Sequence, residues 1–282
     1  MPNLQARLLL DAKCELAEGP VWHGGAFWWT DIQGKAIHRL TGDQHEHWPM
    51  PTRVGTFVPT DRGRWVVACD DGFFYWDPGC EREAIADPQP HAGKTRFNDG
   101  KAGPGGRIFA GTMAFTKEID GAFYRLDPGG ATTELFGGVR TSNGLAWSKD
   151  ERTLWYADTP TGRVDAFDFD AAAGAVSNRR PAVENFPGHP DGLCIDDDEM
   201  LWVGQWGGSC IVRCDPRTGE HVSRVELPVP NVTSCCFGGP DMRSLYITTA
   251  KSDGDAGSGG IWIVDDAGVT GPPAGVYNEG AA

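Results

Sequence analysis

One pattern recurs six times along the 282-residue chain: three short hydrophobic segments separated by turns, often closing on an aromatic residue and an aspartate. The period is roughly 40 to 48 residues, the length of one four-stranded propeller blade. The copies predict an all-β fold: a six-bladed β-propeller with four-stranded antiparallel blades around a central channel, and residues 1–282 in one domain. The first segments of the six copies occupy residues 19–22, 56–59, 99–102, 144–147, 192–195 and 233–237.

Residues 7–10 are expected to close the ring, because they can supply the outer strand of the last blade. A closed ring protects the sheet edges that a linear array of such units would expose. The 39 glycines and 20 prolines are spread along the chain, which fits many short strands joined by turns. The eight cysteines include no CxxC pair, so we expect mainly buried free thiols.

The formal net charge of −14 argues against nucleic-acid binding, because an acidic surface repels phosphate backbones. The first ten residues lack the basic segment and the long apolar run of a signal peptide. No stretch approaches the roughly 18 apolar residues of a membrane-spanning helix. We therefore expect a soluble, cytoplasmic protein that is monomeric or weakly oligomeric.

Four copies carry an oxygen-bearing side chain just before the first segment, in a turn with a glycine as the bend. These side chains belong to Glu18, Asn98, Asn143 and Asp191. In a propeller the first strand of every blade lines the channel, so equivalent positions meet around one axis. Asp and Asn are ordinary turn residues, but Glu is a poor one, and four such residues in one position favour a functional cluster. We expect the four side chains to converge at one mouth of the channel.

This cluster is predicted to bind one divalent metal ion. Carboxylates and amide oxygens are costly to bury together unless a cation lies among them. An all-oxygen set suits Ca²⁺, Mg²⁺ or Mn²⁺, and it can accept Zn²⁺ or Fe²⁺. With few protein ligands, coordination positions are left for water or substrate, as in a catalytic metal site. The identity of the metal stays open.

Seven motifs along the chain occur in the order found in one known family. They are AEGPVW at 17–22, RFNDGK at 96–101, FAGTM at 109–113, SNGL at 142–145, SNRR at 177–180, PDGL at 190–193 and TSCCFGG at 233–239. Over residues 15–265 the chain therefore resembles the SMP-30/gluconolactonase/regucalcin-like family of six-bladed propeller lactonases. The motifs extend over nearly the whole chain, so the resemblance is specific.

The resemblance implies a metal site and a base. It implies that Glu18, Asn143 and Asp191 bind one divalent metal ion, and that Asp191 is the general base. A carboxylate that binds a metal is a weak base, so a water molecule activated by the metal stays open as the alternative.

The resemblance also implies contacts with the substrate. Arg96 and Asn98 are expected to contact the sugar lactone, with Asp99 close by. Family members use an acidic residue in the loop after the Gly-Thr-Met motif, and Glu118 is the nearest candidate in this chain.

The expected activity is metal-dependent hydrolysis of a small-molecule sugar lactone to the aldonic acid. Gluconolactone, xylonolactone and arabinonolactone all stay open as substrates. A serine hydrolase is disfavoured, because the chain has no G-x-S-x-G motif. The alternative is a calcium-binding, regucalcin-like regulatory protein without physiological turnover. A third hypothesis is a propeller that serves as a docking platform and has an inert channel.

Overall fold

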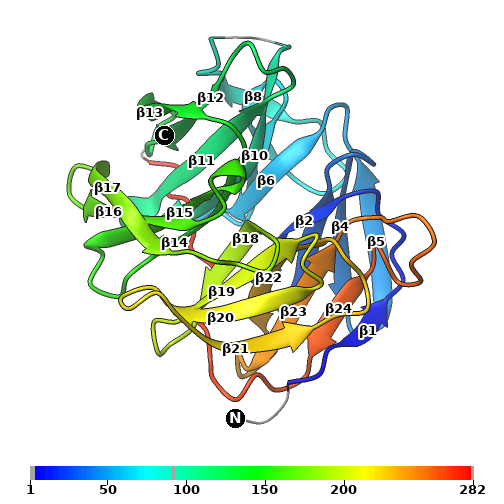
Figure 1. Cartoon of the computed structure of the whole chain (residues 1–282). Helices are drawn as coiled ribbons and strands as arrows, with labels where there is room; N and C mark the ends of the chain where they lie inside the picture. The colour runs from blue at the N-terminus through cyan, green and yellow to red at the C-terminus, as the bar shows by residue number, and fades with distance from the viewer. Residues whose placement is uncertain (1–3, 91–92, 281–282) are drawn as a thin grey trace.

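Six four-stranded sheets follow one another around a central axis in the computed structural model, which describes residues 4–90 and 93–280. In Figure 1 the colours pass once around this ring from blue through cyan, green and yellow to orange, so blades adjacent in the chain are adjacent in space. We number the blades 1 to 6 in the order of their inner strands. The predicted six-bladed β-propeller with four-stranded blades is confirmed.

Blades 1 to 3 run outward from the channel in chain order. Blade 1 consists of β2 (Ala17–His23), β3 (Ala26–Asp31), β4 (Ala36–Thr41) and β5 (Gln44–Pro49). Blade 2 consists of β6 (Val54–Pro59), β7 (Trp65–Cys69), β8 (Gly72–Trp76) and β9 (Glu83–Ala86). Blade 3 consists of β10 (Thr95–Gly103), β11 (Arg107–Ala114), β12 (Gly121–Leu126) and β13 (Thr132–Val139).

Blades 4 and 5 repeat this order, whereas blade 6 takes its outer strand from the N-terminal region. Blade 4 consists of β14 (Ser142–Trp147), β15 (Thr153–Asp158), β16 (Val164–Asp170) and β17 (Ala175–Val183). Blade 5 consists of β18 (His189–Ile195), β19 (Leu201–Trp206), β20 (Cys210–Asp215) and β21 (Glu220–Glu226). Blade 6 consists of β22 (Val232–Gly238), β23 (Ser244–Thr249), β24 (Ile261–Val264) and β1 (Arg7–Leu10).

The ring closes as predicted, because β1 pairs antiparallel with β24. Two 3₁₀ helices, η1 (Pro104–Gly106) and η2 (Thr159–Thr161), lie in connections between strands. Within residues 4–90 and 93–280, no helix has the length and the apolar character needed to cross a membrane.

Every inner strand carries an irregularity in its pairing near its first residues. The pairing of β14 skips from Ser142 to Leu145, and that of β18 skips from Pro190 to Leu193. Such a bulge bends the strand locally and redirects the side chains at that point. The predicted turn before the strand is therefore wrong in detail, because Asn143 and Asp191 lie within the strands, at the bulges.

Gly144 and Gly192 are required by the close approach of the next blade. A Cβ atom on Gly144 would lie 2.5 Å from the backbone nitrogen of Leu193. A Cβ atom on Gly192 would lie 2.2 Å from Ser234 Oγ. Side chains at these positions would push neighbouring inner strands apart. The two glycines therefore let blades 4, 5 and 6 pack tightly around the channel.

Hydrophobic side chains fill the spaces between neighbouring blades. In one cluster, Trp28 and Ile37 of blade 1 pack with Phe57 and Trp65 of blade 2. Sheets packed face to face in this way bury a continuous core. All eight cysteines are free, and six are buried, as predicted; Cys236 is half-buried and Cys80 is exposed.

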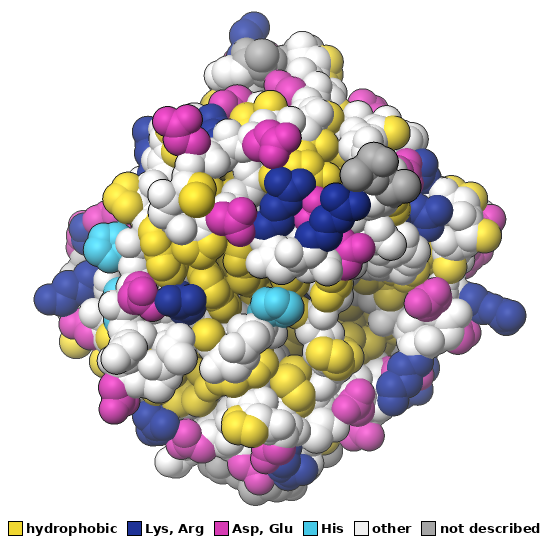
Figure 2. Space-filling model, turned by 180° about the vertical axis from the view of Figure 1, so that it is seen from behind, with side chains coloured by type: hydrophobic (Ala, Val, Ile, Leu, Met, Phe, Trp, Pro, Cys, Tyr) yellow, Lys and Arg dark blue, Asp and Glu magenta, His cyan; other side chains and the backbone are white. Residues whose placement is uncertain are grey.

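The C-terminal segment runs along one end of the channel to blade 2. Tyr277 forms a parallel bridge with Thr60, and Glu279 accepts a hydrogen bond from Arg64 Nη2 at 2.6 Å. Figure 2 shows the molecule from the side opposite to Figure 1; hydrophobic side chains gather toward the middle of this face, and acidic and basic side chains mix around its rim.

Candidate functional site

Polar residues from blades 1, 3, 4 and 5 meet at one end of the channel. Asn98 Nδ2 donates a hydrogen bond to Asn143 Oδ1 at 3.2 Å, and the carboxyl groups of Glu18 and Asp191 lie near enough to change each other's pKa. The charge of Asp99 acts on both of these carboxyl groups. All are buried, with at most 6% of the surface exposed. We call this group the channel cluster; it consists of Glu18, Arg96, Asn98, Asp99, Asn143 and Asp191.

Arg96 and Asn98 of β10 are held in fixed positions. Arg96 Nη1 donates to Asn98 Oδ1 at 2.7 Å and to the carbonyl of Phe97 at 3.0 Å. Asn98 Nδ2 also donates to the carbonyl of Ser142 at 2.7 Å, which ties blade 3 to blade 4. The structure therefore brings both predicted substrate contacts into the cluster, with little freedom for either side chain.

Thr159 of η2 orients Asn143. Asn143 Nδ2 donates to Thr159 Oγ1 at 2.7 Å, and Thr159 Oγ1 donates to the carbonyl of Pro190 at 2.8 Å. Since the amide nitrogen points to Thr159, the amide oxygen faces Asn98 and the rest of the cluster. Sequence analysis missed Thr159, because it lies outside the repeated positions and no motif marks it.

The carboxyl groups of the channel cluster have raised pKa values. Burial raises the pKa of Glu18 to about 8, helped by the nearby charge of Asp99. Burial also raises the pKa of Asp191 well above its ordinary value, and the charges of Glu18 and Asp99 add to this effect. The pKa of Asp99 is raised by burial as well. The cluster therefore concentrates carboxyl groups where water does not stabilise their charges.

Arg96 is the basic residue of the cluster, and its charge interacts with the carboxyl groups of Glu18 and Asp191. Burial lowers its pKa to about 10, an effect that the charges of Glu18 and Asp191 oppose. Asp99 Oδ1 accepts a hydrogen bond from the backbone nitrogen of Gly100 at 2.7 Å, but Asp99 Oδ2 is buried without a partner. A buried acceptor without a donor costs about 1–3 kcal/mol. The side-chain oxygens of Glu18, Asn143 and Asp191 are of the type that binds a hard divalent cation, and these three residues could hold one.

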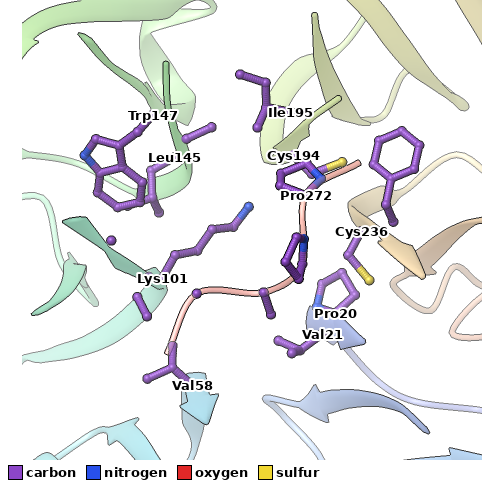
Figure 3. Close-up of a pocket in the computed structure, with 18 of the residues that line it drawn as sticks. Pro20, Val21, Val58, Lys101, Leu145, Trp147, Cys194, Ile195, Cys236 and Pro272 are labelled. Atoms are coloured by element: carbon purple, nitrogen blue, oxygen red, sulfur yellow. The ribbon is translucent and has the colours of Figure 1, made fainter. Parts of the chain in front are cut away.

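A cavity of about 520 Å³ extends along the channel from Asp99 to residues 272–275. Of the channel cluster, Asp99 alone lines it. Lys101 points into this cavity, toward the segment that carries Pro272, and Lys101 Nζ donates to the carbonyl of Leu193 (Figure 3). The sequence favoured a charge at the rim of the channel or on the surface for Lys101; in the structure it lines the cavity together with Asp99.

Glu118 lies apart from the channel cluster. It belongs to the loop between β11 and β12, and its side chain is exposed. A hydrogen bond from Thr116 lowers its pKa. The same loop is attached to the body of the propeller by Arg140 Nη1, which lies 2.7 Å from Asp120 Oδ1. The role of Glu118 toward a substrate stays a prediction.

The fold and the channel cluster together define a class: six-bladed β-propellers with a cluster of buried polar residues at the channel. Within this class the match is specific, because residues 16–251 fit the family model described as the SMP-30/Gluconolactonase/LRE-like region. The chain belongs to this family, and the resemblance found in the sequence motifs is confirmed.

Relatives with similar sequences carry two kinds of name. The regucalcin of Danio rerio is 38% identical over 268 residues, which cover 91% of this chain and 90% of the relative. The pentonolactonase XacC of Haloferax volcanii is 34% identical over 261 residues, covering 89% and 87%. The structure of a calcium-binding regucalcin from Agrobacterium tumefaciens superposes with a TM-score of 0.89 at 25% identity, covering 97% of both chains.

Proposed function

We propose that this protein is a metal-dependent lactonase that hydrolyses a sugar lactone to the aldonic acid. The observation that carries the proposal is the channel cluster, in which three carboxyl groups are buried together and the charge of one arginine acts on two of them, Glu18 and Asp191. Burying unpaired carboxylates is costly, so such a group is retained where it binds a cation or a substrate. Relatives named as lactonases support the reaction class. Gluconolactone, xylonolactone and arabinonolactone are the proposed candidate substrates.

Glu18, Asn143 and Asp191 would hold one divalent ion through their side-chain oxygens, and the ion would supply Lewis-acid polarisation of the lactone carbonyl. Arg96 uses Nη1 within the protein, so its other N–H groups are free in the proposal to donate to oxygens of the sugar. Asp99 Oδ2 is the proposed acceptor for a sugar hydroxyl, because it has no donor of its own.

Asp191 is the proposed general base. One of its carboxylate oxygens takes a proton from a water molecule while the water oxygen forms a bond to the carbonyl carbon of the lactone. The ring carbon–oxygen bond then breaks, and its oxygen leaves as a hydroxyl group after receiving that proton from Asp191, which returns to the carboxylate form. One water molecule is consumed, and the product is the open-chain acid. The Glu118 loop is proposed to contribute to selectivity for the sugar.

A calcium-binding regulatory protein without turnover is the second candidate. The regucalcin relatives favour it, because one of them is described as a calcium-binding protein. The same oxygens would hold the ion in both candidates. A regulator should bind Ca²⁺ with a Kd of about 10⁻⁷–10⁻⁵ M, as sensor proteins do. The eight free thiols fit a reducing compartment such as the cytoplasm for either function.

The test is a matrix of three sugar lactones and five divalent ions. Protein stripped with a chelator is reloaded with Ca²⁺, Mg²⁺, Mn²⁺, Zn²⁺ or Fe²⁺, and acid release is followed with gluconolactone, xylonolactone and arabinonolactone. We expect turnover of at least one lactone that depends on the ion. Calorimetry with Ca²⁺ separates the candidates: micromolar binding without turnover of any lactone favours the regulator.

Asp191→Ala should abolish turnover and leave the circular dichroism spectrum unchanged. The matched control is Asp198→Ala, which removes an exposed carboxylate from the same blade and should keep full activity. Undiminished turnover in Asp191→Ala, or in chelator-stripped wild type, would overturn the proposal.

A further inference from the structure

A second group of side chains of the types that bind metals lies near the seam where the ring closes. Cys14 belongs to the segment between β1 and β2, Asp31 ends β3, and His38 lies in β4. One sulfur, one oxygen and one nitrogen of these residues lie within 4.8 Å of one another. The three residues are only 1%, 7% and 8% exposed. We call this group the seam cluster.

Blade 4 has residues equivalent to those of the seam cluster, and the comparison shows which of them serve the fold. Asp158 accepts backbone N–H bonds from Arg140 at 3.2 Å and Thr141 at 2.8 Å. Asp31 accepts equivalent bonds from Glu15 and Leu16, both at 3.0 Å. The carboxylate is therefore a repeated structural feature. In this comparison Cys14 is the equivalent of Val139 of blade 3. Each lies one residue before the first backbone donor, which is Glu15 in one case and Arg140 in the other.

The position of His38 also has a counterpart in blade 4. His38 pairs with Trp29 across the sheet, and Asp165 pairs with Tyr156 in the same way, two residues before the shared aspartate. Asp165 is neutralised by Arg163 at 2.6 Å and Arg179 at 2.7 Å. The seam cluster has no arginine pair of this kind. At these two positions the seam cluster therefore has a thiol where blade 3 has Val139, and an imidazole where blade 4 has the paired carboxylate of Asp165.

One ring nitrogen of His38 has no partner. Its Nδ1 lies 3.0 Å from His45 Nε2, and its ring stacks on Trp29 with 5.0 Å between the centroids. Its Nε2 is buried and lacks a hydrogen bond. Since Nδ1 is engaged by His45, Nε2 is the nitrogen left for the seam cluster. A buried nitrogen without a partner lowers the stability of the fold by about 1–3 kcal/mol, and a ligand bound to Nε2 would remove this cost.

We propose that Cys14, Asp31 and His38 form a second metal site, for zinc or a similar transition-metal ion, which fastens the segment between β1 and β2 to blade 1. Sulfur, imidazole nitrogen and carboxylate oxygen are the donors that zinc takes in proteins. Tetrahedral zinc with such ligands sets donor atoms roughly 3.3–3.8 Å apart, so atoms within 4.8 Å need only a small adjustment of their side chains.

Hydrogen bonds around the seam cluster match those that orient metal ligands. His45 engages the far nitrogen of His38, and Trp29 Nε1 donates to Cys14 Sγ at 3.4 Å. Outer contacts of this kind fix the tautomer of a ligating histidine and stabilise a thiolate. His45 and His47 are exposed on β5, and His47 pairs with His38, so they offer a path for an ion from the surface.

The experiment uses Co²⁺ as a spectroscopic probe on the full-length protein after treatment with a chelator. Cobalt bound to a thiolate gives an intense near-ultraviolet charge-transfer band. We expect this band in wild type, its displacement by one equivalent of Zn²⁺, and a higher melting temperature with Zn²⁺ than without. Asp191→Asn, which alters the channel cluster, should keep the band.

Cys14→Ser and His38→Gln should lose the band, whereas Cys69→Ser, which removes another buried thiol, should keep it. Circular dichroism checks that each variant is folded. The wild type alone is decisive where a variant fails to fold: a folded wild type that gives no thiolate band with Co²⁺ overturns the proposal. A band that survives in Cys14→Ser overturns it as well.

Discussion

The channel cluster and the seam cluster both bury carboxylates, but they satisfy them differently. In the seam, Asp31 accepts three backbone N–H bonds, from Glu15 and Leu16 at 3.0 Å and from Gly34 at 2.9 Å. In the channel, Glu18 and Asp191 each accept one backbone bond, from the glycine that follows. The difference separates two uses of a buried acid. A carboxylate with three backbone donors holds the fold and keeps one acceptor position for an ion, whereas carboxylates with a single backbone donor and raised pKa values depend on a ligand for their stabilisation.

The largest effect is expected from Asp191→Asn. Turnover of the lactone should fall by about 1000-fold or more, because the proposed base is lost and one charged metal ligand becomes neutral. In the metal-free protein, however, the melting temperature should stay the same or rise, because one of the mutually repelling carboxyl groups is gone. Thermal unfolding in a chelator and initial rates of acid release check the two parts. A large fall in the melting temperature would place Asp191 with the structural acids.

The opposite behaviour is expected of Asp31→Asn. The amide keeps one acceptor oxygen and turns its NH2 group toward one or two of the three backbone donors, so the free energy of unfolding should fall by about 3 kcal/mol. Activity per folded molecule should be retained, since Asp31 lies outside the channel cluster. Urea denaturation and active-site-normalised rates measure these quantities. Asp158→Asn in blade 4 is the matched variant and should behave alike. Loss of activity without loss of stability would erase the distinction between the clusters.

The sequence predicted the channel cluster because propeller symmetry repeats its position. Glu18, Asn143 and Asp191 occupy equivalent places in three blades, so the repeat alone brings them to one axis. The bulges that direct these side chains inward were not predicted, because the residues Asp and Gly are equally typical of a turn.

The seam cluster could not be predicted from the sequence, because its residues do not follow the repeat. Cys14 and His38 break the repeat: the corresponding residues in the comparison with blade 4 are Val139 and Asp165. Their proximity depends on how the linking segment crosses the ends of β3 and β4, which no period encodes. Local spacing therefore finds sites that follow the symmetry of the fold and misses those that depart from it.

The pH dependence of stability should sharpen the description of the seam. Burial lowers the pKa of His38 from 6.5 to about 4; the charges of His45 and His47 add to this, and Asp31 opposes it. As the pH falls, the unfolded chain binds this proton first. The contribution to stability is therefore complete above pH 6.5 and is lost as the pH falls toward 4, by at most about 3 kcal/mol. Urea denaturation of the metal-free protein across this range measures it.

The control for this experiment is His38→Gln, compared with His189→Gln at an exposed position. His38→Gln should flatten the pH dependence between 4 and 6.5, because the titrating ring is removed. His189→Gln should follow the wild type. Coincident curves for wild type and His38→Gln would show that the buried imidazole does not titrate as its surroundings predict.

The smallest effect is expected from Glu118→Gln, which tests whether the site extends beyond the buried channel cluster. The side chain is fully exposed in the loop between β11 and β12, where water and salt weaken the influence of its charge. If the loop contributes to sugar selectivity, KM for the lactone should rise by about two- to threefold while kcat stays unchanged, as for a contact made equally to substrate and transition state. Asp120→Asn in the same loop is the control, since its carboxylate is engaged by Arg140. An unchanged KM would exclude Glu118 from the site, whereas an equal fall in kcat and kcat/KM would place it beside the reacting atoms.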